Sequence, residues 1–176
     1  SLQEVCIGVG YTGVVLSDGH GGVSYTFRES LGPSCGVIRE AGKLRGTPVS
    51  EAARWMLREN LAEASVGAAA VNAVLNRGFL PGKNIAEAVS CTEDDVIGMV
   101  GWFCPLVWKF QQASRFYLFE QRPETCSPSG IAQIMEADCA PQYLGSCTKV
   151  VLTGTSFING TADGLLAACR GAREII

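Results

Sequence analysis

The sequence contains a single histidine, His20, and this scarcity limits the chemistry open to the chain. A metal site built from several histidines is excluded, and a Ser-His-Asp triad would have to use His20 itself. His20 lies between Gly19 and Gly21, in a stretch typical of a tight turn. The sequence therefore gives little support to a hydrolase.

Long apolar runs and basic blocks are also missing. No apolar run approaches the ~18 residues that a membrane helix needs, and residues 1–4 lack the basic start of a signal peptide. The formal net charge is −3 without a lysine or arginine block, which argues against nucleic acid as a partner. With 47% hydrophobic and 18% charged residues, the composition indicates a packed globular protein. We expect a cytoplasmic protein with no membrane partner.

The eight cysteines do not form a recognisable metal motif. None stands in a Cys-x-x-Cys pair, and they are spread along the whole chain, which argues against a zinc ribbon or an iron–sulfur site. Without a secretory signal, most are expected to be buried or surface thiols. A role in binding a soft metal stays open for two or three of them.

The front part of the chain predicts an antiparallel β-meander followed by two helices. Strands are expected at 5–9, 14–17 and 23–27, with the glycine-rich turn 18–22 before the last, and a further short strand at 35–39. Thr47 and Pro48 begin a helix whose apolar stripe runs from Val49 to Leu57. A second helix, about 63–77, is apolar nearly all round and rich in small residues, as expected of a central helix that packs closely.

The back part alternates strands with helices. Strands are expected at 96–100, 116–119 and 150–152, with helices at about 85–89, 106–113, 128–137 and 161–172. This alternation predicts a parallel sheet with right-handed crossovers. Residues 174–176 resemble the start of another strand, so we expect the chain to be a piece of a longer protein.

Several polar residues follow these strands, where open α/β sheets bind ligands. Gly98 and Gly101 have the spacing G-x-x-G, not the G-x-G-x-x-G of dinucleotide-binding proteins, although Glu120 lies where such proteins bind a ribose. Glu120 and Arg122 form either a solvated ion pair or a ligand-binding pair. Asn72 is expected to point inward, where it braces the core or faces a cleft.

Stretches along the whole chain together resemble one family. They are Tyr11-Thr12-Gly13, residues 51–55, residues 63–73, Val100 to Pro105, Glu120 to Pro123 and Thr153 to Thr161. The family is the "putative heavy-metal chelation" domain family, long known only as a domain of unknown function. The resemblance implies an enolase-N-terminal-like domain, a Rossmann-like domain and a ligand cleft where the two meet.

The predicted fold class is therefore α/β, with an enolase-N-terminal-like α+β domain at 1–78, a connection at 79–94 and a Rossmann-like domain at 95–176. The expected function is binding or handling of a heavy metal ion or metal-chelating small molecule in the cleft; the alternative is an enzyme acting on a nucleotide-like or S-adenosyl-type molecule. A transition or heavy metal ion is the expected cofactor, and a homo-oligomer stays open. Glu120 and Cys104 are the candidate metal ligands. The candidate ligand-binding residues are Asn72, Gly101, Phe103, Glu120, Arg122, Thr153, Gly154, Thr155, Asn159 and Thr161, with Glu63 as a further wall residue.

Overall fold

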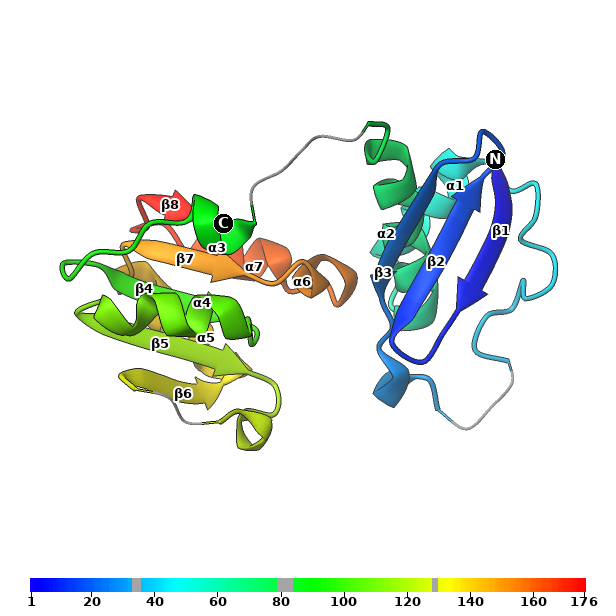
Figure 1. The fold of residues 1–176 in the computed structure, drawn as a ribbon. Helices are drawn as coiled ribbons and strands as arrows, with labels where there is room; N and C mark the ends of the chain where they lie inside the picture. Colours follow the sequence, from blue (N-terminus) through cyan, green and yellow to red (C-terminus); the bar gives the residue numbers. More distant parts are fainter. Residues whose placement is uncertain (33–35, 79–83, 128–129) are drawn as a thin grey trace. The chain divides into compact units, whose positions relative to one another are not determined.

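The computed structural model describes residues 1–32, 36–78, 84–127 and 130–176. The chain divides into two compact units (Figure 1). Unit 1 comprises residues 1–80 and 154–161, and unit 2 comprises residues 81–153 and 162–176. Strands and helices occur in both units, so the predicted α/β class is confirmed. No helix in the described part of the chain has the length and apolar character to cross a membrane.

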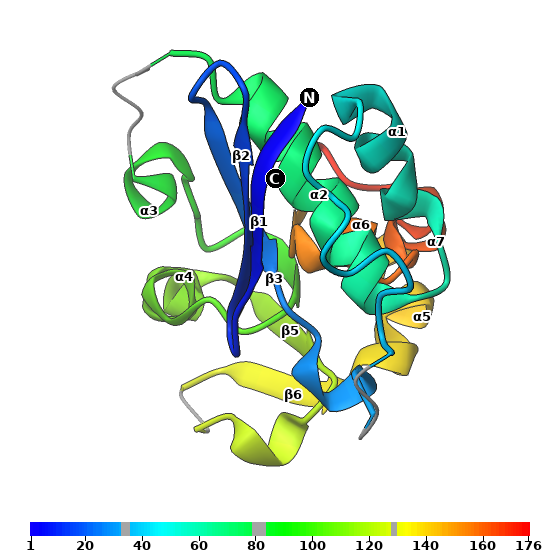
Figure 2. The ribbon, with the colours of Figure 1, turned by 90° about the vertical axis from the view of Figure 1, so that its right-hand side faces the viewer.

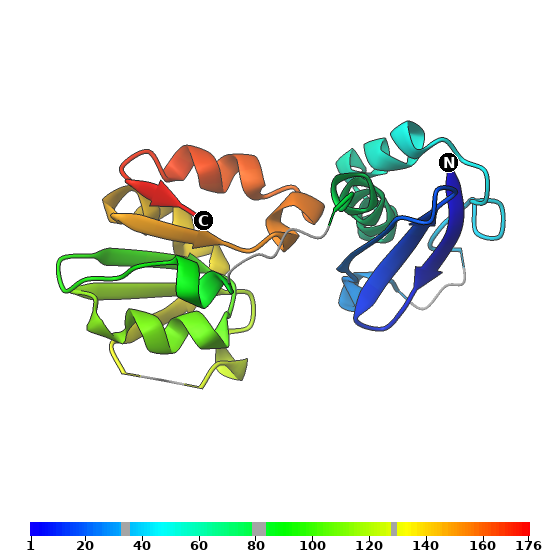
Figure 3. The ribbon, with the colours of Figure 1, turned by 45° about the horizontal axis from the view of Figure 1, so that its top comes forward.

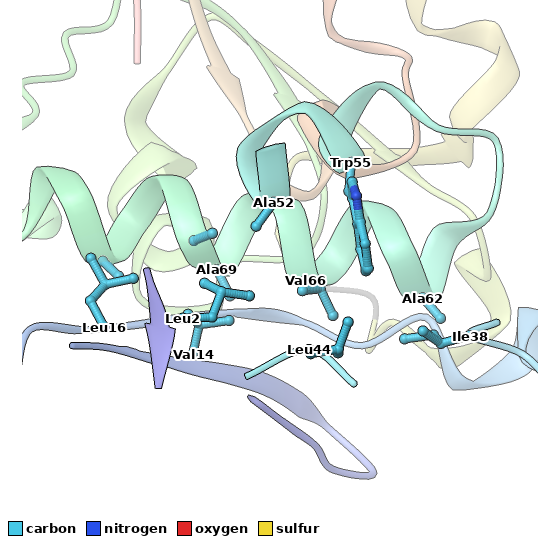
Figure 4. Packing of buried hydrophobic residues seen from close by; sticks show 12 residues of the cluster. Leu2, Val14, Leu16, Ile38, Leu44, Ala52, Trp55, Ala62, Val66 and Ala69 are labelled. Atoms are coloured by element: carbon cyan, nitrogen blue, oxygen red, sulfur yellow. The ribbon is translucent and has the colours of Figure 1, made fainter. Parts of the chain in front are cut away.

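Unit 1 contains a three-stranded antiparallel sheet in the order β1-β2-β3, as the sequence predicted. The strands are β1 (Leu2–Ile7), β2 (Tyr11–Leu16) and β3 (Gly21–Tyr25). Gly19 has a φ of 86° in the turn before β3, a conformation that glycine adopts without steric cost. Leu2, Val14 and Leu16 are buried on one face of the sheet, and this face forms the core of unit 1 (Figure 4).

Helix α2 (Leu61–Leu75) packs on this sheet (Figure 2). The Asn60 side chain caps its first turn by accepting hydrogen bonds from the amides of Ala62 and Glu63, at 3.0 and 3.3 Å. A Cβ atom added at Gly22 would lie 2.2 Å from the Ala73 nitrogen. The small residues seen in the sequence therefore bring the backbones of helix and strand together.

Polar side chains of α2 also bond the free edge of β3. The Ser65 hydroxyl donates to the Tyr25 carbonyl at 2.8 Å, and the Asn72 amide donates to the Val23 carbonyl at 2.7 Å. Asn76 reaches the Gly21 carbonyl at 3.4 Å. Asn72 is exposed, so the expectation that it points inward is wrong: its position on the helix faces the strand edge rather than the core.

The other elements of unit 1 are short. They are η1 (Arg28–Ser30), α1 (Val49–Arg54), η2 (Trp55–Leu57) and α6 (Thr155–Ile158). The predicted stripe does not extend to Leu57, which is 83% exposed, because the helix tightens to 3₁₀ geometry at Trp55 and buries the indole instead. Residues 36–39 form turns and bends rather than the predicted strand; residue 35 lies outside the described residues.

Unit 2 is built on a five-stranded parallel sheet in the order β6-β5-β4-β7-β8 (Figure 3). The strands are β4 (Val96–Val100), β5 (Arg115–Glu120), β6 (Ala132–Glu136), β7 (Lys149–Leu152) and β8 (Glu174–Ile175). Helices α3 (Ile85–Ala88) and α4 (Cys104–Lys109), followed by η3 (Phe110–Gln112), cover one face. The other face packs on α5 (Ala140–Tyr143), η6 (Leu144–Ser146) and α7 (Ala162–Ala168). Burial on both faces explains the continuous apolar runs of the central strands.

Two predictions in this unit are corrected. The helix expected at 128–137 is wrong: Ala132–Glu136 is strand β6, paired in parallel with β5, and 128–129 lie outside the described residues. Ala132 and Ile134 pack on one face and Met135 on the other, the alternation of a strand. The helix expected at 161–172 begins at Ala162 and ends at Ala168, and the strand expected after it is β8.

A buried charge network joins the amino ends of β4 and β7. Asp95 is 1% exposed and lies 3.2 Å from the Lys149 ammonium and 2.9 Å from the Arg173 guanidinium. It also accepts a hydrogen bond from Thr148 at 2.9 Å. Burial alone would raise the pKa of Asp95, but hydrogen bonds from the Thr92 amide, Thr148 and Lys149 hold this pKa at about 2.

This network predicts a loss of stability in acid. The pKa of Asp95 lies below its ordinary value of 3.8, so its stabilisation is complete above that value and is lost as the pH falls through the lower one. The free energy of unfolding should therefore fall by about 2 kcal/mol through this group between about pH 4 and about pH 2. Measured by urea unfolding across this range, the free energy of unfolding of Asp95→Asn should depend less steeply on pH than that of the unaltered protein. Equal slopes in the two proteins would show that Asp95 does not cause this loss of stability.

Candidate functional site

The carboxyl edge of the unit 2 sheet contains a topological switch point. From β4 the chain proceeds to β5 and β6 on one side, whereas β7 and β8 lie on the other. The loops after β4 and β7 therefore leave the sheet beside each other, and the Thr153 amide donates to the Val100 carbonyl at 3.0 Å. In open α/β sheets, the crevice outside such a point is where ligands bind.

The loop after β4 turns sharply at Gly101, which has a φ of 94°. A Cβ atom at Gly101 would lie 3.0 Å from the Thr153 Cβ, so the two loops are in direct contact. The side chains of Trp102 and Phe103 pack against the buried cluster beneath α4. Cys104, the first residue of α4, is exposed.

Glu120 ends β5 and holds this loop in place. One of its carboxylate oxygens accepts a hydrogen bond from the Trp102 amide at 3.0 Å, and the other accepts from the Gln121 amide at 2.8 Å. Each oxygen keeps a further lone pair, with which it can bind a metal ion or accept a hydrogen bond from a ligand. The position of Glu120 was predicted from the sequence, but its hydrogen bond to the Trp102 amide was not. The order of the strands is the signal that could have indicated it, because Trp102 follows β4 and Glu120 ends β5, and these two strands are adjacent and parallel.

Arg122 and Thr153 complete the predicted residues of unit 2. Arg122 is exposed and precedes η4 (Pro123–Thr125), and its carbonyl accepts the Thr125 hydroxyl at 2.7 Å. Thr153 is partly buried beside Gly101. The sheet edge thus brings together Gly101, Phe103, Glu120 and Thr153, and Cys104 directly follows Phe103 in the chain.

The remaining predicted residues belong to unit 1. Gly154 and Thr155 begin α6, which packs through Ile158 on Ala64 and Ala68 of α2. The Asn159 side chain accepts hydrogen bonds from the Thr161 amide at 3.2 Å and hydroxyl at 2.7 Å, around Gly160 with a φ of 74°. The Asn159 amide group therefore supports the local turn.

Asn72 and Glu63 have partners within unit 1 as well. Asn72 bonds the edge of β3 as described, and Glu63 pairs with Arg58 at 3.0 Å. The Arg58 guanidinium in turn lies 4.4 Å from the centre of the Trp55 ring. The predicted cleft draws on residues of both units and stays a prediction.

Within 1–32, 36–78, 84–127 and 130–176, no group of three or more His, Cys, Asp or Glu side chains is arranged to hold a metal ion. The seven cysteines in these ranges are all free thiols. His20 lies in the predicted turn, where its Nδ1 is 3.1 Å from the Asp18 carboxylate. A metal bound by the described residues would therefore have at most two ligands of these types.

Two solved structures resemble the chain over almost its full length. One is a DUF364-family protein of unknown function from Desulfitobacterium hafniense DCB-2, which is 21% identical to this chain and matches it with a TM-score of 0.75. The match covers 98% of this chain and 68% of that protein. The other, a DUF364 protein of unknown function from Pyrococcus horikoshii, is 19% identical, with a TM-score of 0.75, and the match covers 99% and 69%. At these identities the likeness shows the shared fold alone. No curated protein matches the chain.

Family models match both parts of the sequence. The DUF4213 model matches residues 1–75 and the DUF364 model matches residues 84–176; both are described as "Putative heavy-metal chelation". The second match covers more than half of the 176 residues. The chain therefore belongs to the DUF364 family.

Proposed function

We propose that the chain binds a metal ion carried by a small-molecule chelator, at the carboxyl edge of the unit 2 sheet. The observation that carries this proposal is the switch point between β4 and β7, where the Gly101 and Thr153 loops meet. Open α/β sheets bind small ligands at this position. The family description supports a metal as part of the ligand.

The scarcity of protein ligands favours a chelated ion over a bare one. Closed protein sites hold zinc, for example, with about four ligands, whereas the described residues offer no group of three. A chelator would supply the missing donors. Glu120 and Cys104 would then contribute one ligand each, and Arg122 would pair with an anionic group of the chelator.

Glu120→Gln tests this proposal. The variant keeps the size of the side chain but removes its negative charge, so we expect about tenfold weaker binding of the metal chelate. The probes are Ni²⁺ and Co²⁺, each alone and as the citrate complex, with bound metal measured by equilibrium dialysis and elemental analysis.

Glu136→Gln is the matched control. Glu136 is exposed and lies opposite Glu120 in the β5–β6 register, at the same edge but away from the switch point. Equal losses in the two variants, or no binding by the unaltered protein, would overturn the proposal.

A second candidate function, action on a nucleotide-like or S-adenosyl-type molecule, is favoured by the strand order. In order of appearance, β6-β5-β4-β7-β8 is 3-2-1-4-5, the order of dinucleotide-binding folds. Against it, Trp102 and Phe103 occupy the turn where a pyrophosphate needs free backbone. Melting temperatures measured with such molecules separate the two functions, because binding raises the stability of the folded state.

A further inference from the structure

Two buried cysteines lie on the face of the unit 2 sheet that α5 and α7 cover. Cys147 follows η6 and Cys169 follows α7; they are 1% and 2% exposed and share one apolar cluster. The segments that carry them are in contact. A Cβ atom at Gly145 would lie 3.5 Å from the Ala168 carbonyl, and one at Gly171 would lie 2.2 Å from the Gly145 carbonyl.

Neither thiol has a strong structural partner. The Cys147 sulfur donates to the Tyr143 carbonyl at 3.5 Å, and the Cys169 sulfur donates to the Leu165 carbonyl at 3.0 Å. A thiol is a weak donor, and both sulfurs are free of disulfides. Both sulfurs are therefore available as ligands.

We propose that Cys147 and Cys169 form a two-coordinate site for a soft divalent metal ion, Hg²⁺. This site goes beyond the proposed function, because it uses neither Glu120 nor Cys104. Thiolates are soft ligands and prefer soft ions. Each thiol loses its proton to solvent and forms one sulfur–mercury bond, so one Hg²⁺ replaces two protons.

The charge balance selects the ion. The cluster around the two sulfurs consists of apolar side chains with Tyr117 and Tyr143. Burial raises the pKa of both thiols, and a negative charge on Cys169 raises the pKa of Cys147 further, to about 11. Two thiolates with a divalent ion are neutral, whereas a monovalent ion would leave a buried negative charge. Zn²⁺ is disfavoured because it needs about four ligands, and no third one is available among the described residues.

The test uses the 176-residue chain with only Cys147 and Cys169 retained and the other six cysteines replaced by alanine. Titration with HgCl₂ in the presence of glutathione should load one Hg²⁺ per chain, consume both thiols and raise the melting temperature. X-ray absorption should report two sulfur ligands. Loading should be slow, because buried thiols become accessible only through local opening.

Three further variants test whether Hg²⁺ binding needs both buried cysteines. Cys147→Ala and Cys169→Ala in this background should each bind Hg²⁺ at least about tenfold more weakly. A chain that retains only the exposed Cys6 and Cys104 should lose its mercury to glutathione. Circular dichroism verifies that each variant is folded; Cys→Ser variants replace any that is not. The proposal would be overturned if the chain with both cysteines bound two mercury ions, or if the single-cysteine variants bound Hg²⁺ as tightly as that chain does. Neither result would bear on the proposed site at the carboxyl edge of the sheet.

Discussion

Replacing Gly67 with alanine is expected to lower the free energy of unfolding by about 3 kcal/mol. Gly67 lies in α2 where the helix crosses η2, and an added Cβ atom would be 2.1 Å from the Met56 nitrogen and 2.8 Å from the Trp55 carbonyl carbon. Both neighbours are backbone atoms, so no side-chain rotation can relieve the overlap. The helix or η2 must shift, which disturbs the core of unit 1. Urea unfolding of the variant and the unaltered protein measures the loss.

Gly164→Ala is the matched control, because Gly164 is also a helical glycine. It is exposed in α7, and an added Cβ atom would meet nothing within 4 Å. Here alanine should raise the free energy of unfolding by about 0.5–1 kcal/mol, through its better helix propensity. A Gly67→Ala variant as stable as Gly164→Ala would show that α2 and η2 are not in backbone contact.

Removing the carboxylate of Asp95 should be similarly damaging. Asp95→Ala leaves the ammonium of Lys149, whose side chain is 10% exposed, without its closest counter-ion, and the Glu174 carboxylate is 3.8 Å away. Breaking a buried ion pair on one side costs about 3–5 kcal/mol. The free energy of unfolding, measured with urea, should fall accordingly. Asp94→Ala, which alters an exposed neighbour, should change this free energy by less than about 0.5 kcal/mol.

A double variant separates two causes of the lost stability, the charge left unpaired on Lys149 and the packing lost at Asp95. Asp95→Ala combined with Lys149→Met removes both partners, so it should be less destabilised than the sum of the two single variants. Full additivity of the single losses would mean that the two side chains do not interact. Circular dichroism verifies that each protein retains its helices and strands.

The strands that build the unit 2 core could be predicted from sequence because they are buried on both faces. The runs around Ile97, Leu118 and Val151 are apolar without interruption, as expected of strands buried on both faces. In the helices of unit 1, such continuous apolar runs occur only where the sequence is rich in alanine. Strand β6 was not predictable in this way. Its sequence, AQIME, is also good helix sequence, and pairing with β5 decides its state.

The candidate site could be located from sequence, but its internal bonds could not. Glu120 was predicted at the sheet edge because it ends an apolar strand. Its hydrogen bond to Trp102 joins residues 18 positions apart, and no local pattern encodes that contact. For Asn72, the apolar segment before it indicated the core, whereas the face of the helix on which it lies is set by how α2 packs on β3.

The polar residues of α2 that bond β3 affect how unit 1 can associate. The carbonyls of Tyr25 and Val23 already accept hydrogen bonds from Ser65 and Asn72, so a strand from another molecule would have to displace these side chains to pair there. Continuous growth of a sheet from molecule to molecule needs two open edges on each copy. With the β3 edge occupied, pairing at the β1 edge would stop at two copies, so we expect that unit 1 does not form fibres by adding strands to its sheet.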